Sequence, residues 1–164
     1  MLTRRSRARE VALQLLFQKD QNPTPVPRPA VERFARDRLN ADAELAAYCL
    51  ALYDGAVARR PEIDPAITAT AENWRLTRMN PVDRNVLRLG AYELLHDPAG
   101  QPVEVVIDEA IELARRFGSK DSPAFVNGIL DKIARLRGEG RGARGEGEQP
   151  AARQDSPPRS GNPS

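Results

Sequence analysis

The sequence has almost none of the residues that build metal and redox sites. It contains one cysteine, Cys49, and one histidine, His96. A lone cysteine excludes a disulfide within the chain, and these two side chains fall short of the ligand set of a zinc site. A catalytic Cys–His pair would require the two to meet in space, which no motif indicates. Cys49 stands among leucines, as a small buried side chain in a reducing cytoplasm does, so we expect no metal, no cofactor and no enzyme.

Long apolar runs and alternating apolar patterns are also missing. No run approaches the roughly 20 apolar residues that span a bilayer. The Arg-rich start before VALQLLF resembles a targeting signal, but Glu10 and Gln14 interrupt it and no small-residue cleavage site follows. No segment alternates well enough to be a strand. The sequence therefore predicts an all-α, cytoplasmic protein without a membrane segment.

Charge of one sign does not dominate either. The chain has 25 Lys and Arg residues against 23 Asp and Glu residues, a net charge of +2. Such a balance gives no global field for nucleic acid. Arginine far outnumbers lysine, but an Ala-, Arg-, Gly- and Pro-rich composition is first of all typical of a GC-rich genome. Any nucleic-acid site must therefore be local.

Apolar periodicity predicts about seven helices in one domain, residues 1–137. Asp42 and Asn80 suit helix caps, and Pro61 is expected to end the third helix. A Pro-rich segment, 21–30, is expected to be an extended connector. The predicted helices are 4–20, 31–39, 43–60, 64–74 (with Trp74 inward), 81–95, 102–117 and 122–137.

From Gly138 the sequence changes to GEGRGARGEGEQPAARQDSPPRSGNPS. It has no periodic apolar residues, so it buries too little surface to offset its ordering entropy. Gly140, Gly142 and Gly145 match G-x-G-x-x-G, but without the strand and helix that give this motif its meaning. A solvated tail is favoured over an RGG-type RNA-binding segment. We predict a disordered low-complexity tail, residues 138–164.

The most regular pattern, PVEVVIDEAIELARRFGSKDSPAFVNGILDKIARLR, predicts a helical hairpin over residues 102–137. Gly118 suits the position after the first helix, and Ser122 suits the cap of the second. Gly128 is interpreted as a site of close packing, because a glycine inside a helix usually has a steric reason. The apolar face of the second helix is expected to comprise Phe125, Ile129, Ile133 and Leu136.

Two places suit RNA. Four arginines, Arg4, Arg5, Arg7 and Arg9, crowd the start of the first helix, where the helix dipole disfavours cations by ~0.3–1 kcal/mol each. They either trail into solvent as a frayed arm or are held for an anion, and guanidinium groups bind phosphate and stack on bases. The second place is the hairpin loop, where Lys120 suits phosphate, Asp121 and Ser122 suit base edges, and Phe125 suits stacking. Helix capping and core packing explain the last three residues equally well.

Three segments, RAREVALQLLFQ, DRNVLRLGAYELL and IDEAIELARRFGSKDSPAFVNGILDKIA, resemble the bacterial transcription antitermination factors of the NusB family in order and spacing. The resemblance implies two small packed helical bundles. It implies that the Arg-rich N-terminus, with Asp121 and Phe125, contacts boxA-type RNA. It also implies a protein partner, ribosomal protein NusE, with Phe17 and Asp83 at that interface, and a place in an antitermination complex on RNA polymerase.

Val103-Glu104 departs from the Tyr-Lys that many relatives carry there, which removes a cation from the presumed RNA face. The family contains both monomers and homodimers, and the sequence does not choose between them. The function expected is a non-catalytic RNA-binding adaptor that keeps ribosomal-RNA transcription processive. A protein–protein scaffold without RNA contact is the alternative. A helical module like that of certain RNA cytosine-5 methyltransferases is a weaker one, because the chain turns to low complexity at Gly138.

Overall fold

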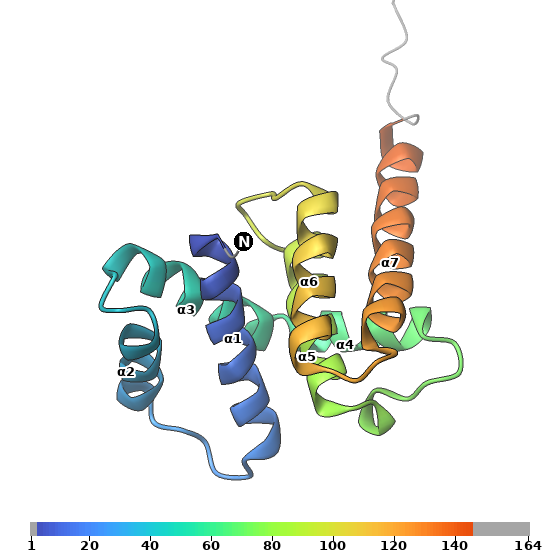
Figure 1. The fold of residues 1–164 in the computed structure, drawn as a ribbon. Coiled ribbons are helices and arrows are strands. Elements are labelled where there is room, and N and C mark those ends of the chain that lie inside the picture. The colour runs from blue at the N-terminus through green and yellow to red at the C-terminus, as the bar shows by residue number, and fades with distance from the viewer. Residues whose placement is uncertain (1–2, 146–164) are drawn as a thin grey trace, which may run out of the picture.

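The computed structural model describes residues 3–145, which form seven α-helices and one short 3₁₀ helix (Figure 1). The elements are α1 (Arg4–Gln21), α2 (Arg28–Arg38), α3 (Ala43–Ala58), α4 (Arg60–Thr70), η1 (Leu76–Arg78), α5 (Pro81–Leu95), α6 (Val103–Phe117) and α7 (Ser122–Gly145). The expected all-α fold is confirmed. Within residues 3–145, no helix is both long and apolar enough to cross a bilayer.

The helices form two small bundles that share α5. Helices α1, α2 and α3 pack together on one side, and α4, α5, α6 and α7 on the other, while α5 also packs against α1 and α3 (Figure 1). Two glycines permit this close packing. A Cβ on Gly55 would lie 2.1 Å from the Tyr92 ring, and one on Gly90 would lie 2.7 Å from Leu130. The two-bundle arrangement expected from the family resemblance is therefore present.

Several predicted boundaries are wrong because proline is tolerated in a first helical turn, where its missing N–H has no partner to lose. Helix α2 begins at Arg28, with Pro29 in its first turn, so the connector is shorter than the predicted 21–30. Helix α4 begins at Arg60, with Pro61 in its first turn and Pro65 inside it. It ends at Thr70, which leaves Trp74 outside the helix.

Helix α7 continues past the predicted end of the domain. Its backbone is helical through Gly145, so the predicted disorder is wrong for residues 138–145. The rest of the predicted tail, 146–164, lies outside the described residues. Leu136 was expected in the buried face of this helix but is 53% exposed.

A buried ion pair fastens α1 to α5. Arg9 Nε and Nη2 donate to the two carboxylate oxygens of Glu93 at 2.8 and 3.0 Å, and each side chain is 2% exposed. Glu109 on α6 lies 3.9 Å from Arg9 Nη1 and accepts a 2.6 Å hydrogen bond from Ser6. Burial raises the pKa of Glu93, although the hydrogen bonds and charge of Arg9 act in the opposite direction. This cluster lies where the two bundles meet.

A second polar cluster closes the other end of α1. Asp20 accepts hydrogen bonds from Arg84 and Asn85 of α5, and Arg88 donates to Asp64 of α4 at 2.9 and 3.2 Å. Burial acts to raise the pKa of Asp20, but the hydrogen bonds from Arg84 and Asn85 outweigh it, and the pKa lies below its ordinary value. Helix α1 is thus held to α5 by ion pairs at both ends.

Removing one member of the Arg9–Glu93 pair is expected to be far worse than removing both. Arg9→Met leaves Glu93 buried without a counter-charge, so the free energy of unfolding should fall by about 3–5 kcal/mol. Arg9→Met with Glu93→Leu replaces the pair by apolar groups and should recover most of that loss. Urea unfolding followed by circular dichroism measures both. A double variant no more stable than the single one would contradict the assignment.

Candidate nucleic-acid interface

The start of α1 is an ordered helix end with arginines on its surface. Thr3 caps it by accepting a 3.1 Å hydrogen bond from the Ser6 N–H. Arg4 pairs with Asp42, the residue that caps α3, and the Arg4 side chain is still 69% exposed. The Arg5 guanidinium lies 5.3 Å from the centre of the Tyr48 ring, a cation–π contact. The arginines are therefore held in place, and the hypothesis of a frayed arm is wrong for residues 3–145.

Arg7 belongs to a chain of charges that crosses between the bundles. Its Nη1 lies 3.0 Å from Glu10 Oε1, and Arg116 Nη1 on α6 lies 3.1 Å from Glu10 Oε2. Glu10 is buried, while both arginines keep part of their surface in solvent. Arg115, next to Arg116 in the sequence, pairs instead with Glu112 on the same helix. Arg116 was missed because its partner is distant in the sequence.

Arg9 does not belong to this surface. It was predicted as a fourth RNA contact, but its guanidinium lies in the core with Glu93, and 2% of its side chain is exposed. Arg5 and Arg9 are four residues apart, a spacing that places them on one helix face. Helix α1 turns that part of the face toward α5, so Arg9 cannot reach phosphate without breaking its buried pair.

The hairpin loop is ordered by Ser122. The Ser122 hydroxyl accepts a 2.9 Å hydrogen bond from the Ser119 N–H, and Ser122 is buried. It therefore orders the loop that precedes α7, whereas a helix cap would accept from an N–H two or three residues later. Lys120 and Asp121 are exposed, and neither side chain makes an ion pair or hydrogen bond within residues 3–145.

A pocket of about 290 Å³ lies beside this loop. It is lined by Trp74, Arg78, Met79, Asn80, Asp83, Ser119, Asp121, Ser122 and Phe125. The Trp74 and Phe125 rings meet edge to face, with centres 6.0 Å apart and planes at 72°. Trp74 is 56% exposed and was missed, because apolar spacing placed it on the inner face of a helix. The polar residues beside it in AENWRL were the only sign of a loop.

A separate apolar groove of about 410 Å³ runs between α1, α2, α5 and α6. Its walls include Leu13, Phe17, Phe34, Val82 and Phe117. Phe17 and Phe117 are 37% and 38% exposed, a large exposure for phenylalanine. Asp83, predicted to share a partner interface with Phe17, lines the other pocket instead. The first turn of α5 separates the two hollows, with Val82 on one side and Asp83 on the other.

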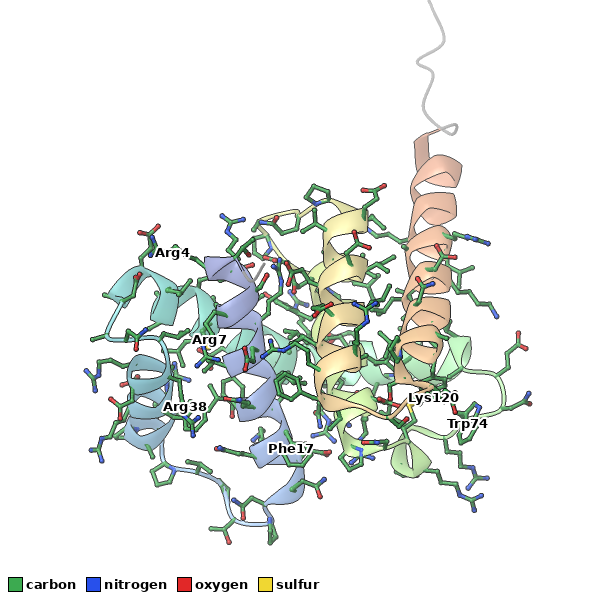
Figure 2. The ribbon with its side chains drawn as sticks, viewed as in Figure 1. Arg4, Arg7, Phe17, Arg38, Trp74 and Lys120 are labelled. Atoms are coloured by element: carbon green, nitrogen blue, oxygen red, sulfur yellow. The ribbon has the colours of Figure 1, made fainter. Side chains whose placement is uncertain are left out.

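The predicted RNA residues therefore fall into two groups rather than one (Figure 2). Arg4 and Arg7 lie at the α1 side of the molecule, and Lys120 and Trp74 lie at the far side, with α6 between them. Arg116 on α6 reaches α1 through Glu10, so its charge lies between the two groups. A single RNA strand that contacts both groups has to pass over α6.

A model of the NusB family matches residues 6–135. The chain belongs to the NusB family. The transcription antitermination protein NusB of Elusimicrobium minutum is 42% identical over 135 residues, covering 82% of this chain and 95% of that protein. The protein of that name from Anaeromyxobacter dehalogenans is 47% identical over 134 residues, covering 82% and 92%.

Solved structures agree with this assignment. T. maritima NusB has a TM-score of 0.71 and 39% identity, over 82% of this chain and 93% of that one. A chain from a structure of antitermination factors NusB and NusE in complex with dsRNA has a TM-score of 0.70 and 25% identity, over 83% and 99%. The NusB-family match covers α1 to α6 and the part of α7 up to residue 135.

Two glycines of the NusB-family hairpin are expected to respond in opposite ways to alanine. A Cβ on Gly118 would lie 2.7 Å from the Ala114 carbonyl oxygen and 2.5 Å from Ser122 Oγ, whereas one on Gly128 would meet nothing within 4 Å. Close packing is therefore the wrong explanation for Gly128. Gly118→Ala should lower the free energy of unfolding by about 1–3 kcal/mol. Gly128→Ala should raise it by about 0.5–1 kcal/mol, because alanine is the better helix former.

Thermal and urea unfolding of the two variants measure this difference, and each serves as the control for the other. Equal effects of the same sign would mean that the loop at Gly118 is not fixed as described.

Proposed function

We propose that this chain is a non-catalytic, cytoplasmic, RNA-binding transcription antitermination factor. It binds boxA-type single-stranded leader RNA of ribosomal-RNA operons together with ribosomal protein NusE, as part of the antitermination complex on RNA polymerase. The family and its relatives' names support antitermination. The observation that carries RNA binding is the set of arginines held on the surface of α1, against the preference of the helix dipole.

The surface arginines remain available to phosphate although they have partners. An exposed ion pair such as Arg4–Asp42 contributes only ~0–1 kcal/mol, so a phosphate can replace it at little cost. Arg5 lies over the Tyr48 ring and is still exposed to solvent, where its guanidinium can meet a phosphate. Arg7 and Arg116 share one carboxylate, which leaves this pair with a surplus positive charge. These four arginines bind the phosphates of the RNA backbone.

The apolar groove at Phe17 suits the protein partner. Exposed aromatic side chains in a hollow are the usual anchors of protein interfaces. Val82 ties the groove to the start of α5, close in sequence to Asp83, the other predicted partner residue. We therefore place NusE at this groove, next to the RNA surface on the same helix α1.

The RNA contacts are tested by a salt series with a triple variant. Arg4, Arg5 and Arg7 each changed to Ala should weaken binding of a boxA-type RNA and flatten the log–log salt slope by about 2, since each phosphate contact with single-stranded nucleic acid contributes about 0.7. Fluorescence anisotropy of a labelled RNA, with and without NusE, measures both.

The matched control removes three other exposed arginines, Arg33, Arg59 and Arg135, so that the net charge falls equally. Its slope should stay near that of the unaltered chain. Equal slopes for the two triple variants would remove α1 as the RNA site, and absence of RNA binding with NusE present would overturn the proposed function in favour of a scaffold.

The partner groove is tested by Phe17→Ala. The loss of a central aromatic anchor should lower the affinity for NusE at least tenfold, because such anchors contribute more than about 1–2 kcal/mol. Val105→Ala on α6 is the control, since Val105 is also an exposed apolar residue and does not line the groove. Isothermal titration calorimetry with purified NusE gives both affinities. Unchanged binding by Phe17→Ala would place NusE elsewhere.

A further inference from the structure

A buried carboxylate lies beneath the arginine surface of α1, where an acid is unexpected. Glu10 is 4% exposed and belongs to the same helix as Arg4, Arg5 and Arg7. A negative charge this close to the proposed RNA surface repels phosphate. Burying that charge also costs free energy unless an opposite charge compensates it. The partners of Glu10 explain its position.

Glu10 holds one arginine from each bundle. Its Oε1 lies 3.0 Å from Arg7 Nη1 on α1, and its Oε2 accepts a 3.1 Å hydrogen bond from Arg116 Nη1 on α6. Arg116 Nη2 also donates to Glu10 Oε1 at 3.4 Å. Two guanidinium groups therefore meet at a single carboxylate, although their positive charges repel each other. The carboxylate compensates that repulsion and keeps the two cations close together.

Each of these arginines has a second contact that restricts its guanidinium. Arg116 lies over the Phe117 ring, 4.9 Å from its centre, and Arg7 Nη2 donates to the Arg38 carbonyl oxygen at 3.5 Å. The Arg7 and Arg116 side chains are nevertheless 43% and 31% exposed, so both can reach a ligand in solvent. Immobilising a flexible side chain on binding costs affinity. Arginines that are already held in place therefore bind an anion at a lower cost.

We propose that Glu10 is a positioning residue, which holds Arg7 and Arg116 as a clamp for one phosphate of the RNA backbone. The carboxylate balances one of the two positive charges, and the remaining charge matches the single negative charge of one phosphodiester. Glu10 itself does not touch the RNA. The assignment rests on the proposed RNA-binding function and adds that arginines from two bundles share one phosphate.

A double-variant cycle tests whether the two arginines act together. With NusE present and a labelled boxA-type RNA, anisotropy should show that Arg7→Ala and Arg116→Ala each lower the affinity about tenfold, the size expected for a charged hydrogen bond. The double variant should bind little worse than either single variant, because one arginine alone cannot clamp. Arg115→Ala is the matched control. Arg115 is 63% exposed and pairs with Glu112, so its effect should add to that of Arg7→Ala.

A salt series on the same variants counts the phosphates. One phosphate of a single strand contributes about 0.7 to the log–log slope. The slope of the Arg7→Ala, Arg116→Ala double variant should therefore be flatter by about 0.7. A change of about 1.4 would mean two separate phosphate contacts. That result, or additive losses in the cycle, would overturn the clamp.

Glu10→Gln tests the positioning role, because the expected sign is opposite to that of simple electrostatics. The substitution removes a negative charge, yet it should lower the RNA affinity about fivefold, since both arginines lose their charged anchor. Glu112→Gln removes a more exposed acid of α6 and should leave the affinity unchanged or raise it slightly. A folded Glu10→Gln that binds RNA as well as the unaltered chain would contradict the role.

Circular dichroism and urea unfolding establish which variants are folded. If Glu10→Gln does not fold, Glu10→Asp takes its place. The shorter side chain keeps the charge but cannot span both arginines, so the RNA affinity should fall by a similar factor, and an unchanged affinity would overturn the positioning role.

The outcomes distinguish this proposal from the proposed function. If the triple variant of Arg4, Arg5 and Arg7 loses RNA affinity while the cycle is additive, the RNA surface on α1 stands and the clamp is wrong. If no RNA binds with or without NusE, both proposals are wrong.

Discussion

The Arg9–Glu93 ion pair is the constraint on which the surfaces of this molecule depend. A charged pair removed from water is tolerated only when both partners meet in good geometry, so it fixes the position of α1 on α5 closely. Helix α1 carries the exposed arginines at one end and Phe17 near the other. Both proposed binding surfaces therefore take their orientation from a pair that touches neither ligand.

Much of the fold follows from local signals in the sequence. Asp42 and Asn80 cap α3 and α5 as predicted, because a side chain that accepts from the next turn acts within a few residues. Arg9 shows the limit of this reasoning. Its spacing from Arg5 is that of a surface neighbour, and its partner Glu93 lies 84 residues away. Periodicity indicates which helix face a residue occupies. It does not indicate which charged side chain is buried and paired with an opposite charge.

The site shows the same limit. The hairpin loop and the start of α7 at Ser122 were predictable, because the signals for them are local. Trp74 was not, because its spacing continues the apolar face of α4, although that helix ends at Thr70. The family resemblance supplied Asp121 and Phe125, and the structure added the side chains that complete their pocket. Gly128 was also misinterpreted. Close packing was inferred there from the sequence, but a Cβ at this position would meet no other atom within 4 Å.

The separation of the two surface groups gives the bundles a joint role. Phosphate contacts position a strand without reading sequence, whereas contacts to bases read it. Here the arginines lie on α1 in one bundle, and the aromatic pocket lies beside α7 in the other (Figure 2). An RNA strand can contact both surface groups in one register only if the bundles keep a fixed spacing. On the proposed function, the buried ion pair and the Glu10 bridge, which join the bundles, would maintain that spacing.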